Sequence, residues 1–285
     1  MGRIVYVNGR YVPLEHAMVS VEDRGYQFAD GVYEVCEVRA GRLIDERRHL
    51  ARLVRSLDEL RVAHLMSLAA LGIILREVVR RNRVHDGLVY VQVTRGVARR
   101  DHPFPPAGTK PALVVTARPI DLAANERVAA EGVAVITLPD ERWARVDIKS
   151  ISLLPNVLAK QAAREQGARE AWLVDRDGKI TEGSSSNAWI VDRDGKLITR
   201  SLDHAILAGI TRAVLFNVIR AHGLSLEERA FTVEEAHQAR EAFVTSATQA
   251  VMPVVRIDDH VIGNGAPGLI ASALRRDYHD HAEAT

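Results

Sequence analysis

The chain has 285 residues, a formal net charge of +1, and a composition of 47% hydrophobic and 26% charged residues, which is ordinary for a globular protein. This length predicts one large or two modest domains. The near-zero charge gives no reason to expect nucleic acid or a membrane surface as a partner. Cys36 is the only cysteine, which excludes an intrachain disulfide and fits a reducing compartment.

No apolar run has the length of a membrane span. The first residues lack the apolar segment of a secretory signal. We therefore expect a cytoplasmic protein that does not associate with membranes.

The first half alternates signals for strands and helices. Asn8–Gly9 between two apolar runs predicts a tight hairpin. A second hairpin is expected around residues 39–42. Leucines at helical spacing predict a helix over 46–62, and Ser67 is the expected N-cap of the next helix. Two further strands are expected, at 88–94 and 112–117.

The second half begins after residues 119–132, which we interpret as the connection between two lobes. A strand is expected at 133–138, and a helix over 210–223 should stop at Gly223. The last ten residues have no core-facing pattern and are expected to fray. Strands and paired helices, followed by strands and helices again, indicate a two-domain α+β fold. The expected limits are 1–120 for a small N-terminal domain, 121–131 for the connection and 132–285 for a larger C-terminal domain.

The segments VDRDGKIT (174–181) and VDRDGKLIT (191–199) are near-copies. Aspartates at alternate positions raise the alternative of a duplicated calcium loop. Each copy has only Asp-x-Asp-Gly and no glutamate at the twelfth position, so the EF-hand pattern fails. Two hairpins with the same Asp–Gly turn are the better interpretation.

Lys149 lies in the most informative stretch, DIKSISLLPNVLAKQAA (147–163). Val146 and Ile148 flank a charged residue, which predicts the end of a half-buried strand, and Pro155 can occupy the first turn of a helix. A lysine among apolar neighbours can lose its proton near neutral pH, and a neutral amine can form a Schiff base with a carbonyl. An exposed lysine at a strand edge is the alternative.

Three polar segments could act with this lysine. One is TEGSSSN (181–187), which on its own could be a small-residue turn. Another is AGITR (208–212), where helix N–H groups could bind an anion. The third is TSAT (245–248) at a strand end. A lysine, a carboxylate and two anion-binding segments form a set that suits pyridoxal phosphate.

The sequence resembles the fold-type IV (class IV) pyridoxal-phosphate aminotransferases, and most closely their D-amino-acid (D-alanine) branch. The resemblance covers nearly the whole chain. It rests on five motifs: EDRGYQFADGVYEV (22–35), VTRGVARRDHPFP (93–105), RVDIKSISLLPNVLAKQAA (145–163), TEGSSSNAWIV (181–191) and ILAGITR (206–212). It implies a small N-terminal α/β domain and a larger, β-barrel-like C-terminal α/β domain that binds the cofactor.

The resemblance also implies residue roles. Lys149 would be the Schiff-base lysine and the acid/base, and Glu182 would pair with the pyridinium nitrogen. Tyr33, Arg100 and His102 would bind the substrate carboxylate. Loop 95–106 would reach the active site of the neighbouring subunit, so the active unit would be a homodimer. The full set of implied cofactor-binding residues is Arg52, Lys149, Glu182, Ser186, Asn187, Leu207, Gly209, Ile210, Thr211, Ser246, Ala247 and Thr248.

Two positions depart from the family pattern. Ala247 stands where relatives commonly have a phosphate-binding threonine, although its amide can still donate and Ser246 or Thr248 could supply a hydroxyl. Arg99 is an additional cation beside Arg100. It could favour an acidic side chain such as that of D-glutamate, or it could be a solvated loop arginine.

The predicted activity is transfer of an amino group from a D-amino acid, such as D-alanine or D-glutamate, to a 2-oxo acid by a ping-pong mechanism. Three rivals share the fold: a branched-chain L-amino-acid aminotransferase, an R-selective amine transaminase and a 4-amino-4-deoxychorismate lyase. A non-enzymatic scaffold that binds the cofactor is a further alternative. No metal is expected.

Overall fold

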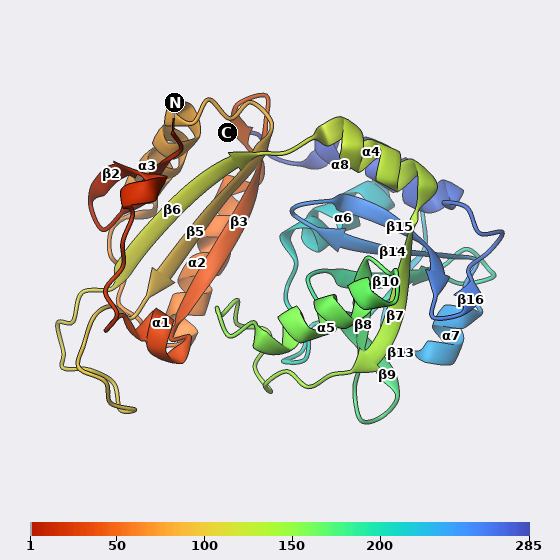
Figure 1. The fold of residues 1–285 in the computed structure, drawn as a ribbon. Coiled ribbons are helices and arrows are strands. Elements are labelled where there is room, and N and C mark those ends of the chain that lie inside the picture. Colours follow the sequence, from red (N-terminus) through yellow and green to blue (C-terminus); the bar gives the residue numbers. More distant parts are fainter. Residues whose placement is uncertain (1) are drawn as a thin grey trace. The chain divides into compact units, whose positions relative to one another are not determined.

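The computed structural model describes residues 2–285 (Figure 1). The chain forms two compact units. Unit 1 holds the residues up to 121 together with 148–152 and 283–285, and unit 2 holds 122–147 and 153–282.

These units differ from the expected domain limits in two respects. The expected connection is a helix, α4 (Leu122–Glu131), that belongs to unit 2. The lysine segment and the last three residues belong to unit 1, because backbone hydrogen bonds join them to its strands. The domain limits themselves stay a prediction.

Unit 1 contains an antiparallel sheet of six strands within the described residues, in the order β2-β1-β6-β5-β3-β4. The hairpin at Asn8–Gly9 is confirmed, with φ values of 45° and 95° that suit a tight two-residue turn. Ser67 caps its helix as predicted, accepting a hydrogen bond from the Ala70 amide. The elements are β1 (Ile4–Val7), β2 (Arg10–Pro13), η1 (Leu14–His16), α1 (Arg24–Phe28), β3 (Gly31–Arg39), β4 (Arg42–Leu43), α2 (Glu46–Glu59), α3 (Leu68–Arg81), β5 (Gly87–Thr94) and β6 (Ala112–Pro119).

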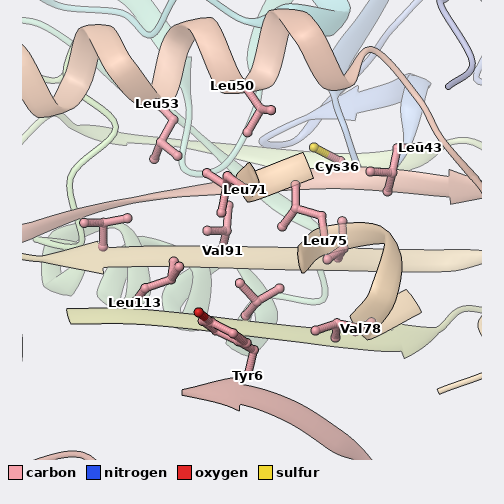
Figure 2. Close-up of a cluster of buried hydrophobic side chains, with 14 of the residues drawn as sticks. Tyr6, Cys36, Leu43, Leu50, Leu53, Leu71, Leu75, Val78, Val91 and Leu113 are labelled. Carbon is pink, nitrogen blue, oxygen red and sulfur yellow. The ribbon is translucent and has the colours of Figure 1, made fainter. Parts of the chain in front are cut away.

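The core of unit 1 lies between this sheet and helices α2 and α3. Leu50 and Leu53 of α2 and Leu71 and Leu75 of α3 pack against Val91 and other strand residues (Figure 2). Strand side chains alternate between the two faces, so one face presents alternate apolar residues to the helices: Val32, Cys36 and Val38 of β3 and Val89, Val91 and Val93 of β5. The opposite face therefore carries Tyr33 and its neighbours.

Unit 2 is built on a mixed sheet, and the part of the chain that the structure describes contributes ten strands to it. Strand order is β12-β11-β10-β14-β15-β7-β8-β9-β13, with β16 beside β15. The strands are β7 (Val133–Pro139), β8 (Glu170–Val174), β9 (Lys179–Gly183), β10 (Asn187–Val191), β11 (Leu197–Thr199), β12 (Leu226–Glu228), β13 (Phe231–Thr232), β14 (Glu241–Ser246), β15 (Ala250–Ile257) and β16 (His260–Val261).

The two VDRDGK segments form the predicted hairpins. In each, the first aspartate accepts hydrogen bonds from the backbone amides two and four residues later. Within residues 2–285, unit 2 contains α4 and four further helices: α5 (Leu154–Glu165), α6 (Ile210–Ala221), α7 (Val233–His237) and α8 (Leu269–His281). Helix α6 buries its predicted apolar face, and Gly223 follows it with a φ of 64°.

Two expectations about local structure are wrong. Residues 145–148 form turns rather than a strand end. The last residues do not fray: α8 buries Tyr278, and Thr285 exchanges two backbone hydrogen bonds with Leu43. Within residues 2–285, no helix combines the length and the apolar character needed to cross a membrane.

Candidate active site

Lys149 lies along the free edge of strand β3. The Tyr33 amide donates to its carbonyl at 3.0 Å, the Ile151 amide donates to the Gly31 carbonyl at 3.0 Å, and Ser150 forms a bridge with Val32. The Lys149 amide also donates to Ser56 Oγ of α2 at 3.3 Å. Strand pairing and one helix contact therefore fix the backbone of this half-buried lysine.

The Lys149 amine faces an aromatic surface. Its Nζ lies 4.3 Å from the centre of the Tyr33 ring, and Tyr33 stacks on Tyr90 with ring centroids 5.6 Å apart. Tyr90 donates to Gln92 Oε1 at 2.6 Å. Burial, and secondarily Tyr33, raises the pKa of Tyr90, so this phenol stays protonated. The structure thus brings together Lys149 and Tyr33, two of the predicted site residues.

Arg52 is held by a buried carboxylate that the sequence analysis missed. Its Nε and Nη2 donate to the two oxygens of Glu34 at 2.6 and 2.9 Å, and His49 Nδ1 lies 2.7 Å from Glu34 Oε2. Burial alone would raise the pKa of Glu34, but Arg52 and His49 outweigh it and lower the pKa to about 2. The bidentate pair fixes the plane of the Arg52 guanidinium.

Arg100 and His102 lie on the exposed loop between β5 and β6. The Arg100 guanidinium sits 4.5 Å from the centre of the Phe28 ring, and the His102 ring lies 5.6 Å from the same ring. Phe28 is the last residue of helix α1. Arg100 and His102, two of the three predicted substrate-binding residues, therefore share one aromatic neighbour.

Glu182 is the centre of a buried polar cluster in unit 2. Its Oε1 accepts from Arg142 Nη1 at 2.5 Å, and its Oε2 accepts from Asn187 Nδ2 at 2.9 Å and from the Leu207 amide at 3.1 Å. Arg142 also binds Asp140 in a bidentate pair. Burial opposes the charge of Arg142, but the two carboxylates raise its pKa, so Arg142 stays cationic.

The segment 206–211 is attached to this cluster. The Leu207 carbonyl accepts from Asn187 Nδ2 at 3.0 Å, and a Cβ on Gly209 would come within 2.0 Å of Asn187 Oδ1. Only glycine fits there. Gly209 precedes α6, whose first amides, at Ile210 and Thr211, receive no side-chain cap. A helix start of this kind is suited to an anion.

The remaining predicted residues lie beside Asn187, where strand β10 begins and strand β14 ends. Asn187 of β10 is paired with Thr245 of β14, so the SSSN and TSAT segments are neighbours. Ser246 Oγ and Thr248 Oγ1 are 3.2 Å apart, with Ala247 between them. The hydroxyl of Ser186, a predicted cofactor-binding residue, donates to Glu170 Oε2 at 3.2 Å, and its contact with the cofactor stays a prediction.

The sequence analysis did not identify three charged residues that bind predicted site residues: Glu34, Arg142 and Glu170, which contact Arg52, Glu182 and Ser186 respectively. Each is a charged residue without a distinguishing spacing. Glu34 and Glu170 lie in strands with mainly apolar neighbours, and that position was the only available signal, because buried carboxylates are rare unless paired. Arg142 lies in a loop, where no periodicity marks it.

The fold is that of an aminotransferase. The chain belongs to the family of class IV amino-transferases, whose sequence model matches residues 31–257. The solved branched-chain amino acid aminotransferase of T.th. with pyridoxamine 5'-phosphate superposes with a TM-score of 0.89. It is 26% identical, and the match covers 98% of this chain and 93% of that one. The branched-chain enzyme of Escherichia coli, 24% identical with a TM-score of 0.90, shares the fold over 98% of this chain and 94% of its own.

Two sequence relatives are more similar. A D-alanine aminotransferase from Bacillus licheniformis is 44% identical over 264 residues, which cover 93% of this chain and 92% of the relative. A D-alanine aminotransferase from Staphylococcus haemolyticus is 36% identical over 280 residues, 98% of both chains.

Proposed function

We propose that this chain is a pyridoxal-phosphate-dependent D-amino-acid aminotransferase, which transfers the amino group of D-alanine or D-glutamate to a 2-oxo acid in two ping-pong half-reactions. The observation that carries the proposal is the identity of 36–44% with D-alanine aminotransferases over at least 93% of the chain. The donor set also fits the cofactor, because it offers a lysine amine, a buried carboxylate and a helix start without a cap.

We propose that Lys149 carries the cofactor covalently, that Glu182 pairs with its ring nitrogen and that Arg52 binds its phosphate. The amides of Ile210 and Thr211 complete the phosphate site, while Leu207 and Asn187 keep Glu182 in place. Gly209, Ser246, Ala247 and Thr248 are proposed to line the same site.

Pyridoxal phosphate, when bound, supplies the electron sink that makes the substrate Cα–H acidic. Once the substrate amine has replaced it on the cofactor, Lys149 would be free to take the proton from the substrate Cα as a general base and to give it as a general acid to the cofactor carbon that Lys149 had occupied. Arg142 remains cationic and donates a hydrogen bond to Glu182 Oε1. Tyr33, against the lysine amine, limits the positions that Nζ can occupy.

Substrate selection is proposed for Tyr33, Arg100 and His102. The planar fork of arginine matches a carboxylate in two hydrogen bonds. Arg100 and His102 are exposed on their loop, as expected of side chains whose ligand comes from outside. The free, buried Cys36 agrees with the proposed cytoplasmic location.

A homodimer is proposed as the active unit, with loop 95–106 completing the neighbouring site. Unit 1 exposes Met18, Val21 and Tyr26 by 82%, 75% and 75%. In unit 2, α5 buries the small Ala159 and Ala163 and leaves larger apolar residues outside: Leu154, Val157 and Leu158. Apolar surfaces of this kind mark protein interfaces.

We expect kcat/KM for D-alanine with 2-oxoglutarate to exceed that for L-alanine by about a hundredfold or more, since misplacing a reacting atom costs roughly that much. Arg100→Ala should lower the value for D-alanine by roughly ten- to a hundredfold, because a hydrogen bond to a charged group contributes about 1.5–3 kcal/mol. Steady-state kinetics measure both effects. Arg99→Ala is the matched control and should change little with D-alanine.

L-leucine separates this proposal from its nearest rival. Comparable turnover of L-leucine and D-alanine would favour the branched-chain enzyme, which the solved structural neighbours represent. Pyruvate release from 4-amino-4-deoxychorismate without an amino acceptor would favour the lyase.

The shared site predicts complementation between one inactive variant, Lys149→Ala, and one impaired variant, Arg100→Ala. In a mixed dimer of Lys149→Ala and Arg100→Ala subunits, one site combines an intact lysine with an intact loop from the other subunit. Purified mixed dimers should therefore show about half of the wild-type activity per dimer. Differently tagged subunits, expressed together and purified through both tags, allow the measurement. Activity no higher than that of the two parent variants would place the loop in its own subunit's site.

A further inference from the structure

The motif EDRGYQFADG (22–31) contains none of the residues proposed to catalyse the reaction, hold the cofactor or bind the substrate. Resting on that function, we infer that Arg24 is a positioning residue for substrate binding: it fixes the backbone of the loop that carries Arg100 and His102. All the contacts involved lie within unit 1, where Figure 1 shows α1 beside the start of the long β5–β6 loop.

Arg24 is almost wholly buried, with 4% of its surface exposed, although it belongs to a helix of five residues. Its Nη1 donates to the carbonyl of Asp101 at 2.7 Å, and its Nη2 reaches the carbonyl of His102 at 3.4 Å. The first carbonyl belongs to the peptide bond that precedes His102, and the second to the peptide bond that follows it. The direction of the His102 side chain, and of Arg100 just before it, follows from this backbone.

Asp30 joins this contact to the base of the loop. It accepts from Arg24 Nε at 2.8 Å and from Arg95 Nε and Nη2 at 2.7 and 2.9 Å. Arg95 also donates to the carbonyls of Leu60 and Arg61. Burial would raise the pKa of Asp30, but the two arginines lower it, so the carboxylate stays ionised between them.

The backbone of the same motif supports the first residues of the loop. The Arg24 amide donates to the Gly96 carbonyl at 2.9 Å, and the Ala98 amide donates to the Glu22 carbonyl at 3.3 Å. Asp23 caps α1 and also accepts from Thr94 Oγ1 at 3.0 Å. Residues 22–30 therefore hold the loop at its start through main-chain bonds and near its tip through Arg24.

Aromatic contacts complete the arrangement. The Phe28 ring has Arg24 at 4.8 Å and Arg100 at 4.5 Å from its centre, with the His102 ring beside it. Phe104, which follows His102 in the loop, packs on two arginines: the guanidinium groups of Arg95 and Arg61 lie 3.9 and 4.8 Å from the centre of its ring. The buried guanidinium of Arg24 therefore contacts Phe28, Asp30 and the backbone of the loop at residues 101–102.

Two substitutions test this inference. Arg24→Met keeps the aliphatic length and removes all donors, while Arg24→Lys keeps the charge beside Asp30 but cannot bind the carboxylate and both carbonyls at once. With either variant we expect KM for D-alanine to rise at least tenfold while kcat changes less than threefold. Arg24→Lys should recover most of the thermal stability lost in Arg24→Met, but not the low KM.

Reagents that differ in a carboxylate provide an independent readout. Aminooxyacetate and hydroxylamine both capture the bound cofactor, and only the first has a carboxylate. The Arg24 variants should slow capture by aminooxyacetate about tenfold and leave capture by hydroxylamine unchanged. In the same proteins, amide hydrogen exchange over residues 96–104 should become faster.

Arg76→Gln is the control for a lost ion pair in unit 1, since Arg76 pairs with Glu46 away from the loop. It should lower stability without changing KM or the ratio of the two capture rates. Arg100→Ala is the reference for the proposed function. If Arg100→Ala slows aminooxyacetate and the Arg24 variants do not, Arg24 is not a positioning residue and the proposed function stands. If Arg100→Ala has no effect either, the loop does not bind the carboxylate and the proposed substrate site is overturned.

Discussion

Lys149→Ala should abolish transamination, with a loss on the order of 10⁴-fold in the rate of the half-reaction with D-alanine. The expectation follows from the position of Lys149: pairing with β3 and the bond to Ser56 fix its backbone, and its Nζ lies against Tyr33. Stopped-flow absorbance of the cofactor measures the half-reaction. The variant should still bind pyridoxal phosphate non-covalently, because the proposed phosphate and ring contacts lie on other residues.

Lys160→Ala is the matched control, because Lys160 follows Lys149 in the same sequence motif and pairs with Glu170 at 3.1 Å. This variant should keep its activity. Borohydride reduction of the wild-type protein followed by peptide mapping should put the pyridoxyl group on Lys149. A label on Lys160 or Lys179 would refute the assignment.

Glu182→Gln should slow the same half-reaction by roughly a hundredfold or more, comparable to the loss of other acid–base support. The substitution keeps the shape but removes the negative charge that would hold a ring nitrogen protonated. It also deprives Arg142 of one of its two carboxylates. Cofactor affinity, measured by fluorescence titration, should fall much less than the rate.

Glu241→Gln separates a catalytic effect from the general effect of removing a buried carboxylate. Glu241 is also buried in unit 2, where it accepts from the amides of Ile270 and Ala271 at the start of α8. Its loss should lower stability and leave the half-reaction rate close to that of the wild type. An unchanged rate in Glu182→Gln would mean that another group pairs with the ring.

Much of the local structure could be predicted from the sequence, because it depends on residues close together in the chain. The turn at Asn8–Gly9 needs positive φ values that these residues adopt easily. The Ser67 cap and the two aspartate turns are likewise completed within four residues. The family motifs around Lys149 and Glu182 added an expected role for each of these residues.

Other features depend on partners far away in the sequence, and only the tertiary structure shows them. The segment 145–148 alternates like a strand but forms turns, because Lys149 and Ile151 pair with the edge of β3 more than a hundred residues earlier. The final residues contain no core pattern, yet they are ordered through backbone bonds to Leu43. Main-chain bonds are independent of side-chain type, so hydropathy could not reveal them.

The sequence by itself determined the hairpins, the helix caps and the residue types of a pyridoxal-phosphate site. The tertiary structure decided which charges meet: Glu34 with Arg52, Arg142 with Glu182, and Arg24 with Asp30 and the loop carbonyls. A single arginine or glutamate has no periodicity from which its partner can be inferred. Burial then makes the pairing obligatory, because an ionised group taken out of water needs an opposite charge or hydrogen bonds to replace its hydration.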